Sequence, residues 1–295
     1  MESPTTRRAD ASEAGAKPVP PPAIPPAPPP RRVTIDDLKK KKERAEPIVM
    51  VTAYDTPTAR IVDRAGVDVI LVGDSLGMVV LGHDATLRVT MEDMVRHTAA
   101  AARARPRALL ATDMPFLSFQ VSPERAVENA GRLVAEGGAD CVKLEGGRAV
   151  VPAVAAITRA SIPVIGHLGL IPQSILHFGG YRVQGRGEAA AAALLADAEA
   201  LVAAGVFLIV LEGIPQELGR RITAAVPVPT VGIGAGPATD GQVLVLHDLA
   251  GLTEEPLPRF VKRYGEVGKA LEAAVAGFAA EVRSGAYPAP AHCYD

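Results

Sequence analysis

The sequence has only two cysteines among 295 residues, which excludes a disulfide framework and gives no cysteine-based metal motif. Cys141 lies in an apolar run and Cys293 lies near the C-terminus, and neither forms part of a Cys-X-X-Cys pair. We therefore interpret both as ordinary reduced thiols.

Long apolar runs are also absent. None approaches the roughly 18 residues that a membrane-spanning helix needs, and the first residues mix acidic with basic side chains instead of forming an apolar signal-peptide core. We therefore expect a cytoplasmic protein without a membrane partner. The net charge is only -2, and no basic stripe interleaved with aromatic residues is present, so we expect no nucleic-acid partner. We therefore expect the protein to bind small molecules.

Residues 1–32 are rich in proline and have hardly any large apolar side chains. Such a composition cannot offset the entropy of ordering, so we predict a disordered N-terminal extension. The whole chain is 48% hydrophobic, and one barrel domain typically needs about 250 residues. We predict one catalytic domain at 33–295, with an N-terminal helix, a helical stretch at 257–282 and a loop-like tail from residue 285.

Short apolar runs alternate with segments that begin with helix-capping residues. The runs lie at 48–52, 69–72, 108–111, 140–144, 163–165, 207–211, 230–233 and 243–246. They are almost wholly apolar, as expected for parallel strands that are covered on both faces. Helix starts are indicated by Thr34 with Asp37, Thr56 with Pro57, Thr90 with Asp93, and Ser122 with Pro123. The alternation predicts an α/β fold, a single (β/α)8 TIM barrel.

Ionisable residues stand at the ends of these runs or just after them. They are Asp74, Asp113, Lys143, Glu145, His167 and Glu212. In a (β/α)8 barrel all strands deliver their last residues to one mouth, so these side chains are expected to converge. Carboxylates at neighbouring strand ends raise one another's pKa unless a cation compensates them. Mg²⁺ suits such a site, because it binds oxygen ligands and usually takes one or two carboxylates together with water and substrate oxygens.

Each of these residues also has a simpler interpretation. Lys143 and Glu145 share one face of a strand, and together they are also consistent with a structural ion pair that closes the barrel. Glu212 projects from an apolar run, which favours a general base with a raised pKa, but it also precedes a helix whose dipole favours an acid. His167 is a candidate for orienting a substrate carboxylate, although a histidine at a strand end is as often merely hydrogen-bonded.

Several segments together are more specific than any single residue. They are 53–55, 72–78, 82–84, 113–116, 142–147, 166–170, 179–185 and 232–236. The last of these, Gly-Ile-Gly-Ala-Gly, has neither the Walker nor the Rossmann order and is a weak signal alone. In this order, however, the segments closely resemble the ketopantoate hydroxymethyltransferase family, and the resemblance runs from about Thr34 to the C-terminus.

The resemblance implies a barrel of the phosphoenolpyruvate/pyruvate type that transfers a one-carbon unit from 5,10-methylenetetrahydrofolate to 3-methyl-2-oxobutanoate. The product is 2-dehydropantoate (ketopantoate), a precursor of pantothenate and coenzyme A. By resemblance, the metal ligands are Asp74, Asp113 and Glu145, the substrate-binding residues are Asp74, Ser75, Asp113, Lys143 and His167, and the proton acceptor is Glu212. The cofactor is Mg²⁺, and the resemblance also implies a homo-oligomer, a decamer.

Two other functions remain as alternatives. A C-C lyase acting on a related 2-oxo acid would use the same metal site, but such lyases generally carry a catalytic cysteine in a mobile loop, and neither cysteine of this chain matches it. A non-catalytic ligand-binding barrel would be expected to have lost Asp74, Asp113 or Glu212, and all three are present.

Overall fold

The structure, a computed structural model, describes residues 31–254 and 256–294. Of the predicted disordered extension, residues 1–30 lie outside the described residues. The described chain forms a closed barrel of eight parallel strands in sequence order, in which β8 pairs with β1. The strands are β1 (Ile48–Thr52), β2 (Val69–Val72), β3 (Leu109–Asp113), β4 (Cys141–Glu145), β5 (Val164–Gly169), β6 (Leu208–Glu212), β7 (Thr230–Ile233) and β8 (Gly241–Leu244). The predicted barrel is confirmed.

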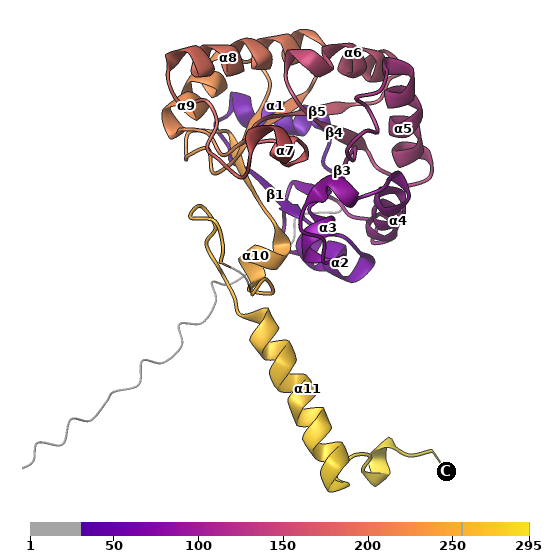
Figure 1. The fold of residues 1–295 in the computed structure, drawn as a ribbon. Coiled ribbons are helices and arrows are strands. Elements are labelled where there is room, and N and C mark those ends of the chain that lie inside the picture. Colours follow the sequence, from indigo (N-terminus) through magenta and orange to yellow (C-terminus); the bar gives the residue numbers. More distant parts are fainter. Residues whose placement is uncertain (1–30, 255, 295) are drawn as a thin grey trace, which may run out of the picture.

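Most of the helices form a ring outside the strands (Figure 1). They are α1 (Ile35–Glu43), α2 (Thr56–Arg64), α3 (Leu76–Val79), α4 (Met91–Ala102), α5 (Pro123–Ala135), α6 (Val151–Arg159), α7 (Ile175–Phe178), α8 (Glu188–Ala203), α9 (Gln216–Ala225), α10 (Leu246–Ala250) and α11 (Val267–Ser284). The capping boxes predicted at Thr34 and Thr90 are present, and Ser122 caps α5. The cap of α2, however, is Asp55 and not Thr56. None of the helices in the described residues is long and apolar enough to cross a membrane.

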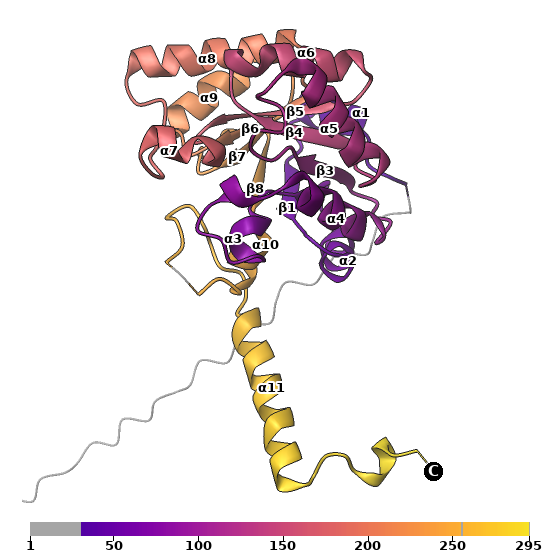
Figure 2. The same ribbon diagram turned by 45° about the vertical axis from the view of Figure 1, so that its right-hand side comes forward.

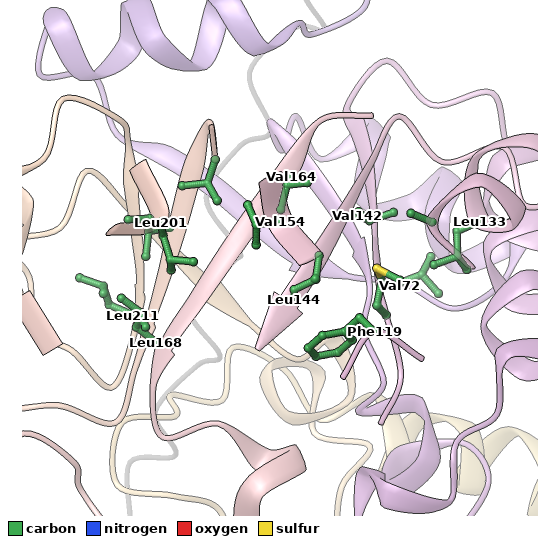
Figure 3. Packing of buried hydrophobic residues seen from close by; sticks show 14 of the residues in the cluster. Val72, Phe119, Leu133, Val142, Leu144, Val154, Val164, Leu168, Leu201 and Leu211 are labelled. Carbon is green, nitrogen blue, oxygen red and sulfur yellow. The ribbon is translucent and has the colours of Figure 1, made fainter. Parts of the chain in front are cut away.

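Alternate residues of each strand point outward or inward, and the two directions bury separate clusters. Outward-facing residues such as Val142, Leu144 and Leu211 pack against helix residues such as Leu133 and Leu201 (Figure 3). Inward-facing residues near the strand starts form a second apolar cluster inside the barrel. The inward positions become polar only towards the strand ends, so the fold provides an apolar floor beneath the mouth.

Helix α1 closes the base of the barrel. Leu38 is fully buried in the inner cluster, and Lys41 and Lys42 form ion pairs of 2.8 Å with Asp68 and Asp240. These aspartates stand just before β2 and β8, and each also accepts a backbone N–H of the preceding strand. Asp140 does the same before β4, where Arg32 pairs with it at 2.6 Å. The N-terminal face of the barrel is therefore fixed by paired charges.

The C-terminal part differs from the prediction. Residues 257–282 were expected to be helical, but the helix begins only at Val267, after an irregular segment that contains Pro256 and Pro258. Proline lacks an amide hydrogen and disfavours helical geometry in the residue before it, which disfavours a helix that continues through Pro256 and Pro258. Helix α11 then projects away from the barrel (Figures 1 and 2).

Candidate active site

The polar residues at the mouth continue the inward-facing positions of neighbouring strands. On β4, Cys141 belongs to the apolar floor, and Lys143 and Glu145 follow at the next two inward positions. On β5 and β6 the corresponding ends are His167 and Glu212. The mouth is thus formed by the same alternation that fills the barrel, as the sequence predicted.

Two aspartates and a lysine form the centre of the site. The backbone N–H of Asp74 donates to Asp113 Oδ2 at 2.9 Å, and Lys143 Nζ lies 3.0 Å from Asp113 Oδ1. All three residues are buried, with 3–4% exposure. Burial raises the pKa of Asp74 well above its usual range, and the charges of Asp113 and Glu145 raise it further. The site therefore contains more carboxyl groups than its single lysine can compensate.

Lys143 remains a cation in this environment. Burial alone would lower its pKa, but the carboxylates of Asp113, Glu145 and Asp74 outweigh burial and raise it above the usual value. Its ammonium donates to His167 Nδ1 at 3.1 Å. Burial and the charge of Lys143 both lower the pKa of His167, so the imidazole is neutral and carries its hydrogen on Nε2.

His167 connects the lysine to the predicted base. Its Nε2 lies 3.1 Å from Glu212 Oε2, although the N–H is not aligned for a hydrogen bond. The Glu212 side chain is 17% exposed, so it borders the site and does not extend into bulk solvent. Gly169 permits this arrangement, because a Cβ there would lie 2.1 Å from the Glu212 carbonyl oxygen. The three side chains thus form a row of contacts from the buried Lys143 ammonium to the partly exposed Glu212 carboxylate.

Glu145 is held by a residue that the sequence analysis did not single out. Its Oε2 accepts the backbone N–H of Gln173 at 2.9 Å, and its Oε1 lies 3.3 Å from His167 Nδ1. Burial raises the pKa of Glu145 to about 7, although Lys143 opposes this effect. Gln173 follows β5 in the turn Pro172–Ser174, and no motif or strand-end rule could have marked it.

The segment that follows this turn lies over the mouth. The hydroxyl of Tyr181 donates to Met78 Sδ at 3.6 Å, and the backbone N–H of Gln184 donates to the Gly213 carbonyl at 2.9 Å. Met78 belongs to α3, and Gly213 follows Glu212. The segment therefore links the residue after β6 with the helix after β2.

Ser75 lies beside Asp74 at the start of α3, but its hydroxyl contacts none of the carboxylates. Its Oγ lies 2.9 Å from the hydroxyl of Tyr54, a residue that is 2% exposed. The structure thus brings six of the seven predicted site residues into one connected group, Asp74, Asp113, Lys143, Glu145, His167 and Glu212. Ser75 lies at its edge, next to Asp74.

The donor set fits a hard dication, but not as three direct carboxylate ligands. No three histidine, cysteine or acidic side chains in the described ranges are close enough together to hold a metal ion by themselves. Asp113 Oδ1, however, is buried without a hydrogen-bond partner there, because the Lys143 ammonium beside it is not aligned for one. Mg²⁺ usually needs only one or two carboxylates. Asp74 and Asp113 match this requirement.

Comparison with known proteins identifies the family of the chain. A family model described as ketopantoate hydroxymethyltransferase matches residues 32–290. The chain is 59% identical to the 3-methyl-2-oxobutanoate hydroxymethyltransferase of Moorella thermoacetica over 261 residues, which are 88% of this chain and 97% of the relative. It is 58% identical to the enzyme of that name from Pyrobaculum neutrophilum over 244 residues, 83% and 93% of the two chains.

Two solved structures are similar in fold. One is 2,3-dimethylmalate lyase, a member of the PEP mutase/isocitrate lyase superfamily, with a TM-score of 0.56, 17% identity and 86% coverage of both chains. The other is phosphonopyruvate hydrolase in complex with oxalate and Mg²⁺, with a TM-score of 0.58, 14% identity, and coverage of 89% of this chain and 92% of the other. At these identities the likeness shows the architecture alone.

Proposed function

Because the chain belongs to the ketopantoate hydroxymethyltransferase family, we propose that its barrel mouth transfers a one-carbon unit to 3-methyl-2-oxobutanoate, with 5,10-methylenetetrahydrofolate as the donor. The product is 2-dehydropantoate, which leads to pantothenate and coenzyme A. The observation that carries the assignment of roles is the row of contacts from Lys143 through His167 to Glu212. It places a carboxylate beside a neutral imidazole, at the edge of a buried cluster of acidic side chains.

Glu212 is the proton acceptor in this proposal. It is the only one of the site's acids that is partly exposed, so it can reach a substrate bound at the mouth. The reaction must remove the proton from C3 of the oxo acid before C3 can form a bond to the methylene carbon of the folate. The neutral imidazole of His167 lies against Glu212 and can hold the carboxylate towards the substrate.

Asp74 and Asp113 would hold Mg²⁺, and Glu145 would complete the metal environment through water. When bound, Mg²⁺ supplies positive charge beside the keto and carboxylate oxygens of the oxo acid, where negative charge develops during the reaction. Lys143 would neutralise part of the substrate carboxylate from the floor of the site. Ser75, next to Asp74, offers a hydroxyl to the same substrate once it exchanges its contact with Tyr54.

The replacement Glu212→Gln tests this assignment. The variant should still bind the oxo acid and the metal, but exchange of the C3 hydrogen of 3-methyl-2-oxobutanoate in D₂O should fall by roughly 10²–10⁴-fold, the usual contribution of a general base. Proton NMR of the oxo acid follows this exchange without the folate. Glu217→Gln, on the exposed surface of α9, is the matched control and should exchange like the parent protein. Parental exchange in Glu212→Gln would remove Glu212 from the role.

The lyase alternative has less support from the described residues. Cys141 is fully buried below the mouth, and burial raises the pKa of its thiol well above the usual value. Cys293 lies in the C-terminal tail. Neither thiol can act at the strand ends. An assay for ketopantoate with and without added Mg²⁺ separates the two reactions, because a lyase would cleave its oxo acid without any folate.

A homo-oligomer, by resemblance a decamer, is the proposed assembly. Five apolar residues of α11 are about half exposed: Val267, Leu271, Val275, Phe278 and Val282. At about 100° per residue their directions fall within an arc of about 80°, so they form one stripe along the helix. Such a stripe on a projecting helix is costly to leave in water, which supports burial of α11 against another copy of the chain.

A further inference from the structure

The proposed mechanism makes no use of Gln173, although this side chain has a central position at the mouth. The residue is 5% exposed and belongs to the turn after β5. Every hydrogen-bonding group of its side chain is engaged. Nε2 donates to Asp74 Oδ2 at 2.8 Å and to the Met114 carbonyl at 2.9 Å, and Oε1 accepts from Gln120 Nε2 at 3.1 Å.

Through these contacts one residue joins the ends of three neighbouring strands. Asp74 follows β2, Met114 follows β3, and Glu145, which accepts the backbone N–H of Gln173, ends β4. Gln173 donates to both acids, from its side-chain NH₂ group to Asp74 and from its backbone N–H to Glu145. These two contacts fix the position of one carboxyl group relative to the other.

The orientation of the amide is fixed by its neighbours. The nitrogen faces two acceptors, a carboxylate oxygen and a backbone carbonyl, while the oxygen faces the Nε2 donor of Gln120. A reversed amide would place its oxygen against both acceptors and its NH₂ group against that donor. Gln120 therefore acts on the carboxylates indirectly, because it keeps the NH₂ group of Gln173 turned towards Asp74.

We propose that Gln173 is a positioning residue, which holds Asp74 and Glu145 in the mutual orientation that binds the divalent cation, and that Gln120 supports it. This inference rests on the proposed function, because it concerns the same cation. Groups that orient the ligands of a metal typically change metal affinity or activity by 10–100-fold when they are removed. Gln173→Ala removes the side-chain contacts and leaves the backbone N–H that donates to Glu145.

The test is the affinity of the full-length protein for Mn²⁺, a paramagnetic substitute for Mg²⁺ whose free concentration is measured by electron paramagnetic resonance. We expect Gln173→Ala to bind Mn²⁺ about 10–100-fold more weakly than the parent protein. Gln120→Ala should show a smaller loss in the same direction. The double variant should be no weaker than Gln173→Ala alone, because Gln120 acts through Gln173.

Gln242→Ala is the matched control. Its amide also donates two hydrogen bonds, to the Gly236 carbonyl and to Thr239 Oγ1, but it touches none of the carboxylates, so its Mn²⁺ affinity should equal that of the parent. Circular dichroism establishes that each variant is folded at the assay temperature. If Gln173→Ala does not fold, the Mn²⁺ affinity of Gln120→Ala tests the proposal in its place. A purely structural role would lower the melting temperature of the variants without changing the Mn²⁺ affinity of the folded protein.

The possible failures are distinguishable. Suppose that the parent protein forms ketopantoate with Mg²⁺ and that folded Gln173→Ala binds Mn²⁺ as tightly as the parent. The positioning role is then refuted, while the proposed function stands. If Gln173→Ala does not fold, parental Mn²⁺ affinity in Gln120→Ala refutes the role in the same way. Equal and additive losses from Gln120→Ala and Gln173→Ala would also refute it, because the two residues would then act independently. A parent protein that forms no ketopantoate and binds no Mn²⁺ would overturn both.

Discussion

The replacement Lys143→Met tests how the buried charges at the mouth are balanced. Lys143 Nζ lies 3.0 Å from Asp113 Oδ1, and both side chains are 5% exposed. Methionine is unbranched and of similar length, so it keeps most of the packing of the lysine stem while it removes the charge. The variant leaves Asp74, Asp113 and Glu145 without a neighbouring cation. The charge of Lys143 lowers the pKa of Asp74 and that of Glu145, so both acids interact with it in the parent protein.

The magnitude follows from the burial of the pair. Removal of one partner of a buried ion pair typically costs about 3–5 kcal/mol, because an uncompensated charge stays behind. For domains of about 150–250 residues, 1 kcal/mol shifts the melting temperature by about 2–4 °C, so Lys143→Met should melt about 6–20 °C below the parent protein. The hydrogen bond to His167 Nδ1 is lost as well, so we expect the fall in melting temperature to exceed the lower end of this range.

The assay is thermal unfolding in EDTA, at one protein concentration, with the double variant Lys143→Met/Asp113→Asn beside the single one. Asparagine keeps an oxygen that can accept the Asp74 N–H, so the double variant removes both charges and retains this hydrogen bond. Its melting temperature should recover most of the loss, because replacement of a whole buried pair is often nearly neutral. A single variant within 2 °C of the parent, or a double variant as unstable as the single one, would refute the reasoning.

Two further predictions concern Glu145 and α11. Burial raises the pKa of folded Glu145 from the ordinary 4.5 to about 7, so its contribution to stability is fully present below about pH 4.5 and is lost as the pH rises through 7. The free energy of unfolding of Glu145→Gln, measured by urea unfolding in EDTA, should therefore rise relative to that of the parent between pH 5 and pH 8, by on the order of 3 kcal/mol. A difference that does not change with pH would contradict this. Leu271→Glu, at a position 59% exposed on the apolar stripe, should lower the sedimentation coefficient, whereas Lys269→Glu, on the opposite face, should not.

The barrel was predictable because short apolar strands alternate with capped helices along the whole of it. The bounds of β1, β2 and β7 match the predicted runs residue for residue, since each is a short apolar segment between clear turn signals. β8 was predicted two residues late, because its first residue is a glycine, a poor strand former. The structure gives the reason for that glycine: a Cβ on Gly241 would lie 2.3 Å from the Ile48 carbonyl oxygen, where β8 closes against β1.

Only those residues of the site that lie at the ends of strands could be predicted from the sequence. Asp74, Asp113 and Glu212 follow from the rule that strand ends converge at one mouth. Gln173 does not, because it lies beyond the strand end and its role depends on which loops fold back over the mouth. The cap at Asp55 was missed for a related reason, since Asp55 and Thr56 both have capping side chains and only the final backbone geometry selects one.

The two ends of the barrel use the same residue type in opposite ways. At the base, Asp68, Asp140 and Asp240 each accept a backbone N–H from the preceding strand and each pair with a lysine or arginine. At the mouth, Asp74 and Asp113 share a single lysine with Glu145, and Asp113 Oδ1 has no hydrogen-bond partner in the part of the chain that the structure describes. The basal charges therefore stabilise the fold, whereas the excess at the mouth opposes it. A cation bound by Asp74 and Asp113, as proposed above, would offset this excess of buried carboxyl groups, and this is the physical argument for the proposed site.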